Sequence, residues 1–143
     1  MKTVADINVL IPILVGWHAH HATAWAWWDH TAPGAVGLCW PVKLGVLRLL
    51  TNPRAMNARP VSPVEALDAW TALARDPRSV WLDEIPSSHE ILLRRFVSDR
   101  APTPNLWTDA WLAALAESLG FRLTSFDADF RSFGLTDFEL LRG

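Results

Sequence analysis

The chain has 143 residues, an ordinary length for one domain; half of them are hydrophobic and 20% are charged. These proportions exclude an intrinsically disordered chain and predict a single domain spanning residues 1–143 with a sizeable core. The formal net charge of −2 lacks the strong positive charge of many nucleic-acid-binding proteins, so any contact with nucleic acid must be local.

The only cysteine, Cys39, cannot support a disulfide framework, which is typical of proteins in a reducing compartment. We interpret it as a buried filler side chain. The apolar run from Val9 to Trp17 is too short to span a membrane. Asp6 and Asn8 interrupt its start and no small-residue cleavage site follows, so it does not fit a signal peptide either. The sequence therefore predicts a cytoplasmic protein.

Short strands and helices are expected to alternate along the whole chain. In the first half we expect a strand at 2–6, helices at 9–14 and 18–30, a strand at 36–39 and a helix at 41–50. In the second half we expect helices at 63–74, 91–97 and 106–119, strands at 79–82, 121–124 and 138–141, and a turn or short helix at 127–133. This order favours an α/β fold with a central, mostly parallel sheet and helices on both faces.

Residues at the helix ends support these boundaries. Ser62 and Glu65 have the spacing of a capping box, and Ser87 and Glu90 repeat that spacing before a second helix. Gly120 follows the long helix where a left-handed C-terminal residue is favoured.

Four aspartates stand at positions that a parallel sheet could bring together. Asp6, and Asp127 with Asp129, follow predicted strands, and Asp109 lies in the first turn of a helix. In open α/β sheets ligands bind outside the carboxyl ends of the strands. Clustered carboxylates repel one another unless a cation offsets their charge, and oxygen ligands without Cys or His favour Mg²⁺ over zinc. A phosphodiester is the natural substrate for such a site.

Four segments resemble motifs of the VapC-type PIN domains, and together they span nearly the whole chain. In order they are VADINVL at 4–10, LRLLTNP at 47–53, DAWLAALA at 109–116 and TSFDADF at 124–130. The resemblance implies a PIN-like fold and a Mg²⁺-dependent endoribonuclease, with Mn²⁺ as a possible substitute. It also implies the toxin component of a type II toxin-antitoxin pair, with a small cognate antitoxin, an RNA substrate, a homodimeric state and no membrane.

Carried over to this sequence, the resemblance implies that Asp6 and Asp109 are the principal Mg²⁺ ligands. Asp127 would complete the catalytic and metal site directly or through water, and a metal-activated water would attack the phosphorus. The supporting residues would be Asn8, Ser125 and Asp129.

The sequence departs from the family at one point. Many members carry a glutamate in the helix after the second strand, whereas residues 41–46 contain no acid and have Gly45 near that place. This loss weakens the expected site for a second metal ion. Lys43 and Arg48 in the same helix are candidates for binding substrate phosphate, although a salt bridge is an equal alternative for Arg48.

Two other functions fit the same residues. One is a metal nuclease acting on DNA, or an enzyme acting on a small phosphoester, because carboxylates on parallel sheets serve many phosphoryl reactions. The other is a degenerate PIN domain that binds a partner without catalysis. The absent glutamate favours the second alternative, and the retained Asp6, Asp109 and Asp127 disfavour it.

Histidine, tryptophan and arginine are abundant enough to invite functional interpretations. Exposed helical positions are the favoured interpretation for His18, His20, His21 and His30. Most of the nine tryptophans are expected in the core or a dimer interface, because Trp25, Trp28, Trp107 and Trp111 fall at helical spacing. The best local basic patch, which could contact RNA, is formed by Arg94, Arg95 and Arg100.

Overall fold

Five parallel strands form one sheet in the computed structural model, which describes residues 1–143. In chain order they are β1 (Thr3–Ala5), β2 (Val36–Leu38), β3 (Ser79–Trp81), β4 (Arg122–Ser125) and β5 (Phe138–Leu140). Their spatial order is β3-β2-β1-β4-β5, so the chain builds outward from β1 on one side and then returns to its other side. The strand order therefore reverses between β1 and β4, which is where such sheets bind ligands.

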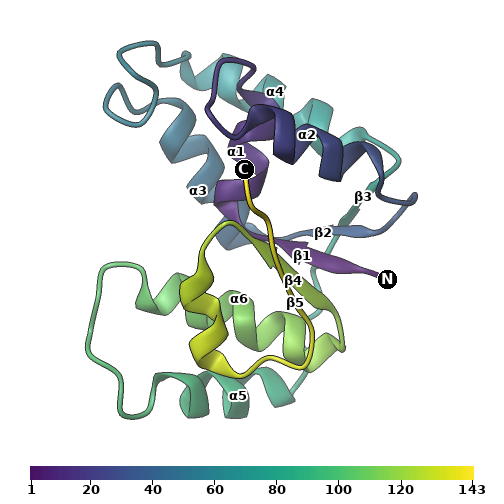
Figure 1. Ribbon diagram of the computed structural model, residues 1–143, viewed down its shortest axis with the longest axis vertical. Helices are drawn as coiled ribbons and strands as arrows, with labels where there is room; N and C mark the ends of the chain where they lie inside the picture. Colours follow the sequence, from purple (N-terminus) through teal and green to yellow (C-terminus); the bar gives the residue numbers. More distant parts are fainter.

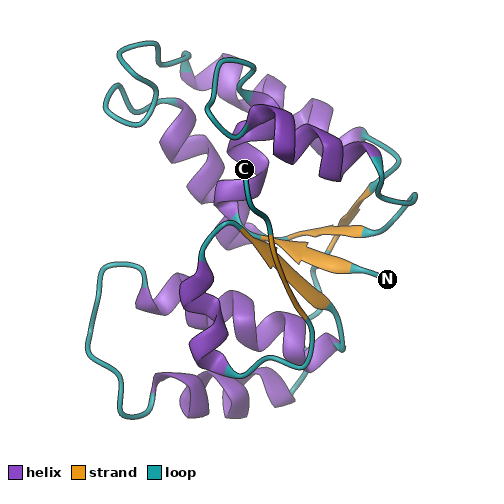
Figure 2. Cartoon of the chain, in the orientation of Figure 1, coloured by secondary structure: helices purple, strands orange, loops and turns teal.

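Helices cover both faces of this sheet (Figures 1 and 2). On one side lie α1 (Ile7–Leu14), α2 (His21–Asp29), α3 (Trp40–Leu50) and α4 (Pro63–Arg75). On the other lie α5 (Ser88–Val97), α6 (Leu106–Leu119) and the 3₁₀ helix η1 (Ala128–Phe133). The predicted α/β architecture is confirmed. None of these helices has both the length and the apolar character needed to cross a bilayer.

Two of the three predicted helix-end signals are confirmed. The Ser62 hydroxyl accepts from the Glu65 amide at 3.2 Å, while the Ser62 amide donates to the Glu65 carboxylate at 3.0 Å. Gly120 ends α6 with a left-handed φ of 68°. The capping box at Ser87 is wrong: Ser87 has helical dihedral angles (φ −61°, ψ −26°) and its side chain caps nothing. A capping side chain normally requires extended backbone at that position.

The helix expected at 18–30 begins only at His21. The backbone amide of His20 donates to the His18 ring at 3.0 Å, and this local bond ties the segment into a turn before the helix. The other elements agree with their predicted ranges to within a few residues at each end.

The main core extends over both faces of the sheet, from α1 to α4 on one side to α6 on the other, and it includes the fully buried Leu10, Leu115 and Leu123. Trp28 is buried as expected. Trp25 and Trp107, however, are 48% and 62% exposed, so a core position is wrong for these two. Helical spacing identifies residues that share a face, but it does not tell which face meets the sheet. The interpretation of Cys39 as buried filler is confirmed, and burial raises the pKa of its thiol to about 11.

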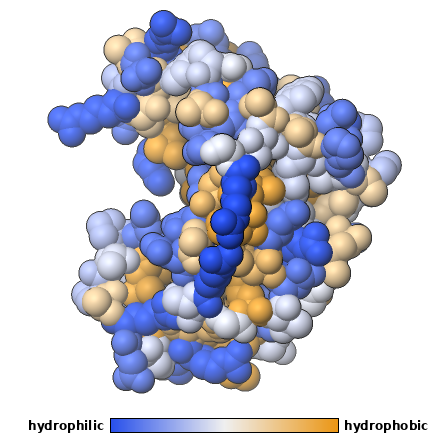
Figure 3. Space-filling model, viewed as in Figure 1, coloured by the Kyte–Doolittle hydropathy of each residue, from blue (hydrophilic) through white to orange (hydrophobic).

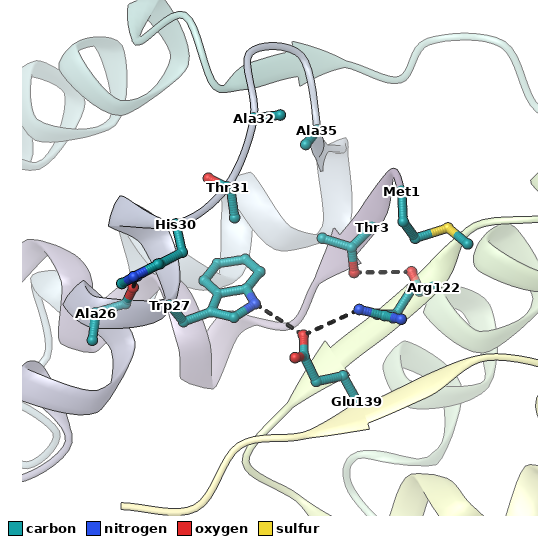
Figure 4. A pocket seen from close by; sticks show the side chains of 10 residues that line it. All are labelled: Met1, Thr3, Ala26, Trp27, His30, Thr31, Ala32, Ala35, Arg122 and Glu139. Carbon is teal, nitrogen blue, oxygen red and sulfur yellow. Dashed lines mark hydrogen bonds and ion pairs between the residues drawn. The ribbon is translucent and has the colours of Figure 1, made fainter.

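A polar cluster links the sheet to α2. The Trp27 indole of α2 donates to Glu139 of β5 at 2.9 Å, and Arg122 of β4 lies 4.0 Å from the same carboxylate (Figure 4). Thr124 also donates to Glu139, at 3.2 Å. These contacts join α2 to the last strand and connect the side chains of β4 and β5.

Candidate active site

Asp6 and Ser125 lie side by side where β1 and β4 end. The strands pair with Ala5 opposite Thr124, which places the next residue of each strand at the same edge of the sheet. The Ser125 hydroxyl donates to Asp6 at 2.8 Å, and the Ile7 amide donates to the other carboxylate oxygen at 2.8 Å. Burial raises the pKa of Asp6, while these two hydrogen bonds oppose the rise.

Asn8 connects the start of α1 to the end of β4. Its side-chain oxygen accepts from the Phe126 amide at 3.1 Å, and its side-chain nitrogen donates to the Ser125 hydroxyl at 3.1 Å. The same hydroxyl accepts from the Asp127 amide at 2.9 Å. The Ser125 oxygen therefore links three segments, and this network holds Asp6 and the turn that carries Asp127 in fixed relative positions.

Asp127 and Asp129 stand at the start of η1. The Asp127 side chain caps this short helix by accepting from the Asp129 amide at 2.9 Å. One of its oxygens is therefore committed to the turn. Asp127 faces the same cavity as Asp6, whereas Asp129 is exposed and faces an adjoining cavity.

Asp109 reaches the site from the first turn of α6. Burial and the negative charges of Asp6, Asp127 and Asp129 raise the pKa of Asp109 to about 7. The shift shows that uncompensated negative charge is concentrated here in the metal-free protein. The structure thus brings together aspartates from three distant segments, as the strand pattern predicted.

The carboxylates face a cleft with a volume of about 570 Å³. One wall comes from α3 and the loop after it, and the other from the beginning of α6. In the space-filling view the molecule is hollowed between the α3–α4 and α5–α6 connections (Figure 3). The residues that line the cleft are Asp6, Ile7, Asn8, Ile11, His18, His20, Arg48, Leu49, Ala55, Met56, Asn105, Thr108, Asp109, Phe126 and Asp127.

His18 and His20 are cleft residues that the sequence interpretation misplaced. They lie on the turn before α2, and the His20 ring stacks on Phe126 with centroids 4.6 Å apart and planes 18° apart. Burial, aided by His20 and His21, lowers the pKa of His18. The exposed helical interpretation is therefore wrong for these two. His21 lies in α2 but is half-buried, and His30 is exposed but follows the last residue of that helix.

Asn105 is a second cleft residue that the sequence analysis missed. It lies four residues before Asp109, a spacing that places two residues on the same helical face, so the signal was present in the sequence. Of the two candidates on α3, Arg48 lines the cleft and Lys43 does not. The Lys43 ammonium lies instead over the Trp40 ring, 4.9 Å from its centroid.

The position of the absent glutamate is filled by a neighbouring side chain. Gly45 is buried in α3, and a Cβ atom there would overlap Cδ1 of Ile7 from α1. The two helices can approach this closely because Gly45 has no side chain, which leaves room for Ile7 of α1 against α3.

The donor set fits a hard divalent cation. No three His, Cys, Asp or Glu side chains are drawn together tightly enough to form a closed metal site. Mg²⁺ does not need one, because it keeps several waters and takes one or two carboxylates together with substrate phosphate oxygens. Three carboxylates around an open cleft, with the pKa of Asp109 raised by its neighbours, match that requirement.

Comparison with known proteins decides the family. The sequence profile of the PIN domain matches residues 3–134, which include Asp6, Asp109, Asp127 and Asp129. The chain belongs to the PIN-domain family. This PIN domain is 34% identical over 140 residues to Ribonuclease VapC41 of Mycobacterium tuberculosis, covering 95% of this chain and 96% of that protein. The resemblance to VapC-type PIN domains is therefore confirmed.

Solved structures share the fold of this PIN domain. VapC20 of Mycobacterium tuberculosis, described as a toxin that cleaves the sarcin-ricin loop, superposes with a TM-score of 0.67 at 18% identity, covering 99% of this chain and 100% of that one. A VapBC2 assembly from Rickettsia felis, bound to a DNA fragment of its promoter, superposes with a TM-score of 0.71 at 8% identity and with the same coverage of both chains. At these identities the likeness supports the fold alone.

Proposed function

We propose that this PIN domain is a Mg²⁺-dependent endoribonuclease and the toxin of a type II toxin-antitoxin pair. The observation that carries the proposal is the convergence of Asp6, Asp109 and Asp127 on one open cleft at the switch point of the sheet. The name of its relative VapC41 supports RNA as the substrate. In this proposal the aspartates of the cleft would hold the ion against one phosphate of the strand.

Each aspartate has a defined part in this proposal. Asp6 and Asp109 are the principal ligands, because one is fixed by two hydrogen bonds and the other faces it from α6. Asp127 completes the site directly or through water, since one of its oxygens already caps η1. Bound Mg²⁺ would activate water for in-line attack on phosphorus and offset charge on the leaving oxygen. The exposed Asp129 is a supporting acid.

The remaining cleft residues position the reacting groups. Asn8 and Ser125 keep the carboxylate of Asp6 in one orientation through their shared hydrogen bonds. Arg48 makes no ion pair in the protein and lines the cleft, so its guanidinium is free to bind a substrate phosphate. Lys43 has a weaker claim because its ammonium is directed toward Trp40.

The partners in this proposal are a small cognate antitoxin and a second copy of the chain. The cleft combines carboxylates with apolar residues such as Ile11 and Met56, which suits a basic, amphipathic protein segment. Exposed Trp40, Leu44 and Trp107 are candidates for the dimer interface. Sedimentation at micromolar concentration tests the dimer, and a monomer there would contradict it.

The first experiment is cleavage of a mixed pool of transfer and ribosomal RNA by the purified protein. Discrete fragments are expected with Mg²⁺ or Mn²⁺, and none with EDTA or with Asp6→Asn. Asp68→Asn is the matched control, because Asp68 is an exposed aspartate of α4 that lines neither cavity beside the aspartates. Single-stranded and duplex DNA in parallel reactions test the DNA nuclease alternative.

Two outcomes would contradict this proposal. Cleavage of DNA in preference to RNA would establish the alternative nuclease. A folded protein that binds Mg²⁺, as measured by a thermal shift, but cuts no RNA from total cellular extracts would indicate a domain that binds without catalysis.

A further inference from the structure

A second cavity of about 540 Å³ adjoins the active-site cleft, and Asp109 lines both. Its walls are the loop before α6, which includes Arg100 and Thr103, and the helix η1, which includes Arg131. Hydrogen bonds from Arg100 to Ser132 bring the start of this loop against η1. Of the three proposed metal ligands, Asp109 alone borders both cavities.

The second cavity contains an arginine without a partner. Arg131 is exposed, and its guanidinium makes no ion pair with any acid of the protein. It also makes no hydrogen bond, although Asp129 is two residues away and lines the same cavity. A guanidinium offers five N–H donors in a planar fork. The unpaired guanidinium of Arg131, beside a site proposed to hold one phosphate, can therefore bind a second anion.

Arg100 is held in place by its neighbours. Its guanidinium donates to the Ser132 hydroxyl and to the Ser132 carbonyl, both at 2.7 Å, and lies 4.2 Å from the centroid of the Phe133 ring. These contacts are with neutral groups, so they leave its positive charge uncompensated. Arg100 thus supplies a fixed positive field to the cavity, while Arg131 can still move to meet a ligand.

The charges of this region favour a phosphate at one place only. Asp109 and Asp129 repel an anion at the border with the cleft, where the proposed cation would offset them. Arg100 and Arg131, which line the same cavity, attract an anion. A strand whose scissile phosphate lies at the carboxylates would therefore bring a neighbouring phosphate toward Arg131.

We propose that this cavity is a second RNA subsite, in which Arg131 binds a backbone phosphate next to the scissile one and Arg100 supplies fixed charge. The inference rests on the proposed ribonuclease function and deepens it by naming the path of the strand. In this proposal the RNA strand passes over Asp109, from the main cleft into the second cavity. Arg131 positions substrate and takes no part in the chemistry at the scissile bond.

The test compares Arg131→Gln with Arg75→Gln, which removes the same charge from an exposed arginine of α4 that lines neither cavity. The probe is a fluorescein-labelled, random-sequence single-stranded RNA of about 12 nucleotides, long enough to contact several phosphates. Binding is measured by anisotropy over a range of salt, with Ca²⁺ in place of Mg²⁺ and the RNA checked for integrity on a gel. Cleavage of the pool RNA with Mg²⁺ is followed in parallel.

We expect Arg131→Gln to weaken binding about three- to tenfold and to reduce the slope of log K against log salt by about 0.7, the effect of one lost phosphate contact. In cleavage KM should rise while kcat stays near the wild-type value, because the residue acts on binding alone. Arg131→Lys should recover part of the affinity, since it restores charge without the fork. Arg75→Gln should behave as wild type.

Three results would overturn the subsite. Wild-type affinity and salt slope in Arg131→Gln, with RNA still cut by the wild-type protein, would remove the subsite and leave the proposed function intact. An equal loss in Arg75→Gln would show a general effect of charge. A wild-type protein that neither binds nor cuts RNA would overturn both proposals.

Discussion

The Ser125 hydroxyl donates to the Asp6 carboxylate at 2.8 Å, across two strands whose residues are 119 positions apart in the chain. The same oxygen receives the side-chain N–H of Asn8 and the backbone N–H of Asp127. One serine therefore sets the relative positions of the first and last of the three proposed ligands.

Removing that hydroxyl is expected to affect both folding and metal binding. Ser125→Ala should lower the free energy of unfolding by about 1–3 kcal/mol, because it leaves a buried carboxylate and an amide without a partner. It should also weaken Mg²⁺ binding about 10- to 100-fold by releasing the ligand from its orientation. Urea unfolding and metal titration measure the two effects. Ser118→Ala on α6 is the control, since the Ser118 hydroxyl bonds only to a carbonyl of its own helix.

The raised pKa of Asp109 predicts how stability depends on pH. With the folded-state pKa near 7 and the ordinary value at 3.8, the folded protein holds this proton more tightly than the unfolded chain does. The metal-free protein should therefore lose stability as pH rises from about 4 to about 7. Asp109→Asn should reduce that loss in thermal unfolding, leaving the smaller part that comes from the raised pKa of Asp6, and an unchanged pH profile in this variant would contradict the assignment.

The same proton competes with the metal ion. Mg²⁺ requires the ionised carboxylate of Asp109, so its apparent affinity should increase from pH 6 to pH 8 and level off above the pKa. The thermal shift produced by Mg²⁺ should accordingly be larger at pH 8 than at pH 6. Calorimetry in buffers of different ionisation enthalpy measures the proton release directly; binding at pH 6.5 without proton release would rule out Asp109 as a ligand.

Replacement of Gly45 tests the contact between α1 and α3. Gly45→Ala gains about 1 kcal/mol of helix propensity but forces Ile7 to move, at a cost of about 1–3 kcal/mol for overpacking. The single variant should be less stable than wild type. Adding Ile7→Val removes the Cδ1 atom and should make the pair at least as stable as Ile7→Val alone. Purely additive effects in this double-mutant cycle would exclude the contact as the cause.

The cap of α4 offers a prediction independent of the active site. Ser62→Ala removes the side-chain acceptor for the Glu65 amide but keeps the Ser62 backbone amide, whose hydrogen bond is the main cause of the lowered pKa of Glu65. We expect a loss of about 1 kcal/mol in the free energy of unfolding. RNA cleavage should be unchanged, because Ser62 lines neither cavity beside the aspartates. A marked loss of activity in a folded Ser62→Ala protein would contradict the expectation that the cap of α4 does not affect the active site.

The sequence allowed the fold and the main acids to be predicted because both depend on local patterns. Short apolar strands alternate with helices, and Asp6 and Asp127 directly follow strands that a parallel sheet must align at one edge. To predict that Asp109 joins them, a further rule was needed: the N-termini of the helices that follow parallel strands lie at that same edge of the sheet. Its assignment as a metal ligand, like that of Asp6 and Asp127, stays a prediction until metal binding is measured.

Other features depend on tertiary contacts that no local pattern reports. His20 reaches the cleft because the chain turns before α2 and its ring stacks on Phe126, a residue more than 100 positions away. The exposure of Trp25 and Trp107 depends on which face of each helix meets the sheet. Arg131 is significant only because it lies beside Asp109 in space, and spacing along the chain gives no sign of that.

The strand order has a consequence for when this protein can act. Because β4 inserts beside β1 only after residues 122–125 have been made, a nascent chain on the ribosome carries Asp6 and Asp109 without the strand that aligns them. The carboxylate cluster can thus form only after β4 has been made and paired with β1. The site of the proposed ribonuclease therefore stays incomplete until residues 122–127 can fold against β1.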